Sequence, residues 1–199
     1  MNGPGHRDAD AFHRVQDADR PVGAERHSCP GAQHACHRIL RRASVAKSWH
    51  REKPRDADAY LRFLTIQPEV SAGPVAVTGY CMGAVLAIRT AAAHPDQVAA
   101  VAGFHPGNLV TVAPDSPHRL VPKLAAQVHL GHAENDMTPK AISELNQALD
   151  AAGVGYTSET YPGTVHGFTM SDTDAFNPSA LQRHWDRLLP LLDRTLANS

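Results

Sequence analysis

The chain has 199 residues, 42% of them hydrophobic, and a formal net charge of −1. This length favours one domain with a substantial core, and the balanced charge gives no electrostatic basis for binding nucleic acid or an anionic membrane. The N-terminus lacks the apolar segment of a secretory signal, and the three cysteines form no dense disulfide pattern, so we expect a protein of the reducing cytoplasm.

Residues 1–55 form the first of two compositionally distinct parts. Residues 1–50 contain only eight large apolar residues, without helical or strand periodicity, and six of the 13 histidines. Such a segment buries too little apolar surface to offset its ordering entropy, so we predict an irregular segment with a short helix around His37–Ala46. The cluster CPGAQHACH, from Cys29 to His37, lacks the ligand spacing of structural zinc sites, and no metal is expected there.

The pattern becomes globular from Asp56 onward, which predicts a domain over 56–199. A helix is expected over Asp56–Gln67, with Tyr60, Phe63 and Leu64 on one face. The further expected elements are a strand Val75–Thr78, a helix Met82–Ala93, strands Val98–Gly103 and Ala126–Leu130, a helix Pro139–Ala152, a strand Tyr156–Tyr161 and an amphipathic helix Pro178–Ala197. Alternating strands and helices predict an α/β fold, with a mostly parallel sheet covered by helices on both faces.

The uncharged run Val70–Ile88 is nearly long enough to span a membrane. Glycine and proline interrupt it, however, at Gly73, Pro74, Gly79 and Gly83. A buried strand followed by a buried helix is therefore expected, and no membrane association.

Three residue types that cooperate in nucleophilic catalysis follow three predicted strands. Cys81 lies in VTGYCMGAVLA, in the G-x-nucleophile-x-G pattern of a nucleophile elbow, Asp136 lies in GHAENDMTP, and His166 lies in YPGTVHGF. Because functional groups of an α/β sheet gather at the carboxyl ends of its strands, we expect the three side chains to meet. The order nucleophile, acid, histidine is that of the α/β-hydrolases.

A thiol at an elbow needs activation, since the ordinary pKa of cysteine is about 8.5. The first turn of the following helix favours an anion, and His166 would accept the thiol proton and later return it to the leaving group. Asp136 would orient that imidazole, and the backbone N–H of Met82 would be one oxyanion donor. Close packing of strand on helix is expected to leave little space for side chains at Gly79 and Gly83.

Each assignment has an alternative. A G-x-C-x-G pattern also arises where a buried cysteine lies next to glycines. His166 is also consistent with a surface histidine, and Asp136 with an acid near the start of the helix that begins at Pro139, where Thr138 is an alternative N-cap. Glu134 lies in the same loop as Asp136 and is a rival for the acid role.

Further candidates surround the predicted nucleophile. Tyr80 and Phe104 are candidates for an apolar substrate pocket and His105 for a residue that faces the site, although core packing or a loop position explains them equally well. A serine esterase is disfavoured because Ser71 and Ser143 lack flanking glycines.

The stretch from about residue 56 to 197 resembles the dienelactone hydrolase family, a cysteine branch of the α/β-hydrolases. The motifs that carry the resemblance are AYLRFLTIQPEVSAGPVAVTGYCMG, GHAENDMTP and YPGTVHGF, and G-Y-C-x-G together with Y-P-G-x-x-H-G-F is specific to that family. The resemblance implies that Cys81 is the nucleophile, Asp136 the orienting acid and His166 the base. It also implies hydrolysis of an enol-lactone or similar small ester, without a metal or organic cofactor.

The family also places several strands before the elbow, with a loop that supplies an oxyanion donor and a glutamate that contacts the thiol. Nothing in residues 1–55 resembles these strands, so we expect them to be missing or replaced. The leading hypothesis is a hydrolase that works through a thioester acyl-enzyme. The alternative is a non-catalytic, truncated hydrolase-like protein that self-associates, for example as a homodimer, through its incomplete sheet.

Overall fold

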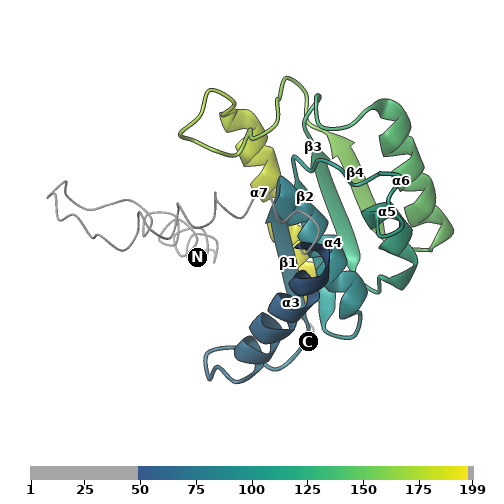
Figure 1. Cartoon of the computed structure of the whole chain (residues 1–199). Helices are drawn as coiled ribbons and strands as arrows, with labels where there is room; N and C mark the ends of the chain where they lie inside the picture. The colour runs from purple at the N-terminus through teal and green to yellow at the C-terminus, as the bar shows by residue number, and fades with distance from the viewer. Residues whose placement is uncertain (1–48, 197–199) are drawn as a thin grey trace, which may run out of the picture. The chain divides into compact units, whose positions relative to one another are not determined.

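The computed structural model describes residues 49–196 (Figure 1). Three predictions therefore concern residues that are wholly or mostly outside this range. They are the irregular N-terminal segment, the helix at His37–Ala46 and the missing N-terminal strands. The same holds for the CPGAQHACH cluster.

The described chain alternates strands with helices, as predicted. The elements in chain order are α3 (Trp49–Thr65), β1 (Val75–Tyr80), α4 (Met82–Ala93), β2 (Val98–Phe104), α5 (Pro117–Leu120), η1 (Val121–Lys123), β3 (Gln127–His132), α6 (Pro139–Ala151), β4 (Tyr156–Thr160) and α7 (Pro178–Leu196). The short α5 and η1 were not predicted, because elements of four and three residues are too short to show an apolar periodicity in the sequence.

The four strands form one sheet in the order β1-β2-β3-β4, and each neighbouring pair is parallel. Parallel pairing brings the carboxyl ends of all four strands to the same edge. β1 runs two residues further than predicted because Gly79 and Tyr80 continue the register against Gly103 and Phe104. Cys81 therefore follows β1 directly.

Helices cover both faces of this sheet, which confirms the predicted fold class (Figure 1). On one face, buried side chains of α4 and α6, including Ile88 and Leu145, pack with Val101 of β2. On the other face, Leu188 of α7 belongs to a second cluster, which contains Phe104 of β2. Alternate residues of β2 thus enter different cores, as the pleat of a fully covered strand requires.

Helix α3 differs from the prediction in its start and in the side chain it buries. It begins at Trp49 rather than Asp56. Leu61 is buried, whereas Tyr60 is 71% and Phe63 is 56% exposed. The apolar face read from the sequence is therefore only partly covered in the described part of the chain. Within residues 49–196, we find no helix with the length and apolar character needed to cross a membrane.

Candidate active site

Cys81 occupies a strained turn between β1 and α4. Its backbone has φ 55° and ψ −122°, a left-handed conformation that non-glycine residues rarely adopt and that is found at functional sites. The Cys81 N–H donates to Phe104 O over 3.1 Å, and Cys81 O accepts from Ala84 N over 3.2 Å. The turn is thus held by both the neighbouring strand and the first turn of α4, and it leaves the thiol exposed.

The two glycines of the elbow differ in their surroundings. A Cβ atom at Gly79 would lie 2.1 Å from Gly83 O and 2.6 Å from Ala84 N, so no side chain fits there. A Cβ atom at Gly83 would have nothing within 4 Å. The expectation of crowding is right for Gly79 and wrong for Gly83, because the backbone of Gly83 is itself what crowds Gly79.

The structure brings Cys81, His166 and Asp136 together at the carboxyl edge of the sheet. His166 Nε2 lies 3.0 Å from Cys81 Sγ, and His166 Nδ1 lies 2.6 Å from Asp136 Oδ1. The three groups form one continuous hydrogen-bonded chain, although 85 residues separate the cysteine from the histidine. An imidazole held this way can exchange a proton with the thiol on one nitrogen while the carboxylate orients the other.

The acid of this chain is Asp136 rather than its rival Glu134. The Asp136 side chain is fully buried, and its second oxygen, Oδ2, accepts from Ala133 N over 2.6 Å. Glu134 Oε1 instead accepts from Gly163 N over 3.0 Å. The N-cap of α6 is Thr138, whose hydroxyl accepts from Ala141 N. Asp136 is therefore not needed as a helix cap and faces the histidine.

A second loop contact, which the sequence did not reveal, holds the histidine backbone. Asn135 Oδ1 accepts from His166 N over 2.8 Å, and Glu134 N donates to Thr164 O over 3.2 Å. The loop after β3 is therefore bonded along its length to the loop after β4. The only signal of this contact in the sequence was the position of Asn135 beside Asp136. That signal is weak, because the side chain of an asparagine in a loop usually hydrogen-bonds the backbone of its own turn.

The three predicted pocket residues have different surroundings. Tyr80 is 39% exposed, and its hydroxyl lies 2.8 Å from His184 Nε2 of α7. Phe104 is completely buried in the core under α7, so it packs as a core residue and lines no open pocket. His105 is also buried, and its ring lies edge-on to His166 with a centroid distance of 5.0 Å. Only Tyr80 of the three keeps a surface open to a ligand.

Several histidines of the described chain are buried, and His105, His129 and His184 make ring contacts with Tyr80 or Phe104. Burial lowers the pKa of His129 and of His184 to about 4. Burial also lowers the pKa of His132 and of His105, and the neighbouring His166 lowers that of His105 further. Desolvation disfavours a charged ring, so these four histidines are neutral near pH 7.

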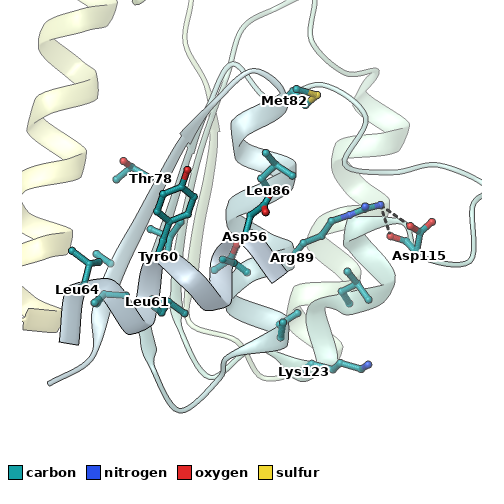
Figure 2. A pocket seen from close by; sticks show the side chains of 18 residues that line it. Asp56, Tyr60, Leu61, Leu64, Thr78, Met82, Leu86, Arg89, Asp115 and Lys123 are labelled. Carbon is teal, nitrogen blue, oxygen red and sulfur yellow. Dashed lines mark hydrogen bonds and ion pairs between the residues drawn. The ribbon is translucent and has the colours of Figure 1, made fainter. Parts of the chain in front are cut away.

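The N-terminus of α4 also borders a hollow along β1. Met82 is the first residue of α4, so its N–H has no acceptor within the helix and is available beside Cys81. Its side chain lines a hollow of about 680 Å³ between α3, β1 and α4, together with Tyr60, Leu61 and Leu86 (Figure 2). Cys81 itself does not line this hollow. In the described part of the chain, no group of three or more His, Cys, Asp or Glu could hold a metal ion.

Comparisons with known proteins extend the resemblance seen in the sequence. The model of the dienelactone hydrolase family matches residues 22–196. This match begins well before residue 56, where the resemblance seen in the sequence begins. A Bradyrhizobium protein named "Probable 2-oxo-3-(5-oxofuran-2-ylidene)propanoate lactonase" is 28% identical over 145 residues, which are 68% of this chain and 56% of that protein. An uncharacterized protein of Caenorhabditis elegans is 24% identical over 152 residues, which are 73% of this chain and 94% of that protein.

Solved structures share the fold. The crystal structure of a dienelactone hydrolase-like promiscuous phosphotriesterase from metagenomic libraries has a TM-score of 0.64 at 19% identity, and the match covers 94% of this chain and 80% of that one. At this identity the likeness concerns the fold. The chain spans only about half of the length of the Bradyrhizobium relative, 56%.

Proposed function

Because the chain belongs to the dienelactone hydrolase family, we propose that it hydrolyses a lactone or small ester through Cys81, His166 and Asp136. One observation carries this proposal, the hydrogen-bonded chain from Cys81 Sγ through both nitrogens of His166 to Asp136 Oδ1. The groups stand in the order and at the spacing that nucleophile, base and orienting acid require.

The first half-reaction forms a thioester. His166 Nε2 takes the proton of Cys81, and the thiolate attacks the carbonyl carbon of the substrate, whose oxygen becomes an oxyanion. The tetrahedral intermediate then expels the alkoxide, which takes the proton from His166. In a lactone this alkoxide stays tethered to the acyl group, so ring opening releases no fragment. Asp136 stabilises the positive charge on His166 while it holds the proton.

The second half-reaction returns the free thiol. His166 takes a proton from water as the water oxygen attacks the thioester carbonyl, and the proton passes to Cys81 Sγ as the carbon–sulfur bond breaks. The Met82 N–H, at the N-terminus of α4, supports the oxyanion in both steps. This sequence uses only side chains, backbone and water. An exposed thiol such as Cys81 also suits a reducing compartment, which supports the cytoplasm as the place of action.

The test is a pre-steady-state assay with p-nitrophenyl acetate, together with mass analysis of the acid-quenched protein. We expect a burst of p-nitrophenol and an acetyl adduct on the peptide that contains Cys81. The variant Cys81→Ala should show neither, whereas Cys36→Ser, a matched cysteine removal, should keep both. Turnover that survives in Cys81→Ala would overturn the proposed mechanism.

A second candidate function, self-association without catalysis, is favoured by the outer edge of β1. Among the described residues β1 pairs only with β2, and its sequence VAVTGY has no charge or proline of the kind that protects exposed edges. The apolar hollow beside it contains Tyr60 and Leu64 of α3 (Figure 2). A strand edge is self-complementary, so the occupant we propose is a second copy of this chain.

Sedimentation equilibrium tests this second candidate. The wild-type protein should sediment as a dimer, and Thr78→Lys should shift it to a monomer, because Thr78 is an exposed residue of β1. Lys123→Thr, which changes charge at the far end of the hollow, serves as the control. A wild-type protein that is monomeric at about 100 µM, a concentration far above the Kd of a specific dimer, would exclude this interface.

A further inference from the structure

His105 lies beside the elbow in a strained and buried position. It follows the last residue of β2, Phe104, whose carbonyl oxygen accepts from Cys81 N. Its own N–H donates to Gly131 O over 2.8 Å, and its φ is 38°. The residue is only 1% exposed. A histidine in a left-handed conformation is unfavourable on its own, and such strain persists where surrounding structure and function maintain it.

Two contacts join the His105 ring to the loop that carries His166. His105 Nε2 lies 2.9 Å from Thr169 Oγ1, and Thr169 stands three residues after His166. The ring also packs edge-on against His166, with centroids 5.0 Å apart and an interplanar angle of 72°. It makes a similar contact with Phe168, with centroids 5.3 Å apart. The end of β2 is thereby connected to the loop that carries His166.

The His166 side chain needs such support because it is 40% exposed. Asp136 holds its Nδ1, and Asn135 holds its backbone. Neither of these two hydrogen bonds is a packing contact with the imidazole ring of His166. A packed neighbour restricts the ring so that Nε2 stays on Cys81 Sγ, and a displacement of about 1 Å at a catalytic group is enough to lower a rate substantially.

The charge state of His105 fits this role. The ionisable groups that face it are His166, Asp136, Tyr80 and His184. Burial and the charge of His166 lower the pKa of His105, whereas Asp136 raises it. Burial is the largest of these effects, so His105 stays neutral while His166 takes up the proton. A positive charge on the His105 ring, 5.0 Å away, would disfavour protonation of His166.

We propose that His105 is a positioning residue, which Thr169 anchors and which holds the His166 imidazole in line between Cys81 and Asp136. This inference rests on the proposed function, in which His166 activates the thiol. It assigns His105 a role through His166 rather than a contact with substrate, because the ring is buried.

The test measures alkylation of Cys81 by iodoacetamide near pH 6, with the Cys81 peptide quantified by mass spectrometry. At this pH a thiol that lacks a basic partner is almost entirely protonated and reacts slowly. The variant His166→Ala gives the rate of such an unassisted thiol. The assay requires no knowledge of the natural substrate and reports only the cysteine–histidine interaction.

Four variants separate positioning from general structural support. His105→Ala should lower the alkylation rate by about tenfold or more, and Thr169→Val, which changes the loop by one atom, should lower it by at least about threefold. His105→Gln places an amide near the position of Nε2 and should restore most of the rate. Thr173→Val is the matched control, because the Thr173 hydroxyl bonds only to Met170 O in the same loop among the contacts described, and it should leave the rate unchanged.

The double variant His105→Ala/Thr169→Val provides the decisive comparison. If the two residues act as one unit, the double variant is no slower than His105→Ala alone. Wild-type rates in both Thr169→Val and His105→Ala would overturn the positioning role, as would loss in Thr173→Val equal to that in Thr169→Val. A wild-type protein that reacts no faster than His166→Ala would instead refute the proposed catalytic function, so the two failures are distinguishable.

Discussion

Acidification from pH 7 to pH 5 is expected to weaken the packing of α7 against the sheet. His184 of α7 and His129 of β3 are 1% and 2% exposed, and the pKa of each is lowered to about 4. In the unfolded chain a histidine has a pKa of about 6.5. Between these two values the unfolded chain binds more protons than the folded one, so stability is complete above about pH 6.5 and is lost as the pH falls toward 4.

The size of this effect follows from the two pKa values. At pH 5, a histidine with a folded pKa of about 4 costs the folded state about 2 kcal/mol of stability relative to neutral pH. Two independent histidines would together cost about 4 kcal/mol. The joint cost is somewhat smaller, because the charge of His129 is itself one cause of the lowered pKa of His184 and His129 is mostly neutral at pH 5. A domain is stable by only about 5–15 kcal/mol, so this loss is a large fraction of the total.

Urea denaturation at pH 7, 6 and 5 measures the effect, with tryptophan fluorescence as the signal. Trp185 is a suitable reporter because its ring lies 4.5 Å from that of His184. His184→Phe keeps an aromatic ring against Phe104 and should remove about half of the pH dependence. The double variant His129→Phe/His184→Phe should remove most of it, and the difference from wild type cancels the contribution of the carboxylates.

Two results would refute this reasoning. One is a free energy of unfolding that changes by less than about 1 kcal/mol between pH 7 and pH 5 in the wild type. The other is an equal pH dependence in the wild type and in the double variant, since the buried histidines would then not be the groups that take up the protons.

Three further predictions concern the elbow, the acid and the core. Gly79→Ala should prevent folding or cost several kcal/mol, whereas Gly83→Ala should change the denaturation midpoint little, because only the first position is crowded. Asp136→Asn should keep the fold by circular dichroism but lower kcat for p-nitrophenyl acetate by about 10²–10⁴-fold, since it leaves His166 in the wrong tautomer; a kcat within twofold of wild type would contradict this. Leu188→Ala, in the core under α7, should lower the urea-unfolding free energy by about 2–5 kcal/mol without loss of the Cys81 acyl adduct.

Much of the fold was predictable because its signals are local. Each of the predicted strands and helices from Val75 onward is present, and no end differs by more than two residues from the prediction. The limits of α6 illustrate why. Thr138 caps its start and Gly153, at φ 67°, follows its end, and both signals act within one turn of the residue concerned. The start of α3 was missed because Pro54 within the helix and the polar surroundings hide its first turns.

The sequence pointed to the residues that lie together in the candidate site, but it did not exclude neighbouring residues that compete for the same roles. From the sequence, Asp136 is the preferred acid and Glu134, in the same loop, is its rival. The pairing of two loops 30 residues apart places Asp136 against His166, whereas Glu134 accepts from Gly163 N. The same pairing gives Asn135 its contact with His166 N.

The sequence by itself determined the residue types of the chain Cys81–His166–Asp136, their order and their places after parallel strands. These depend on strand patterns and on glycine turns, which are properties of short segments. Only the tertiary structure decided that Phe104 and His105 are buried, that Gly83 has space beside it and that His105 packs against His166. The physical reason is that burial and side-chain contact depend on which distant segments share a surface, and it is the sheet that brings α7 and the two site loops together.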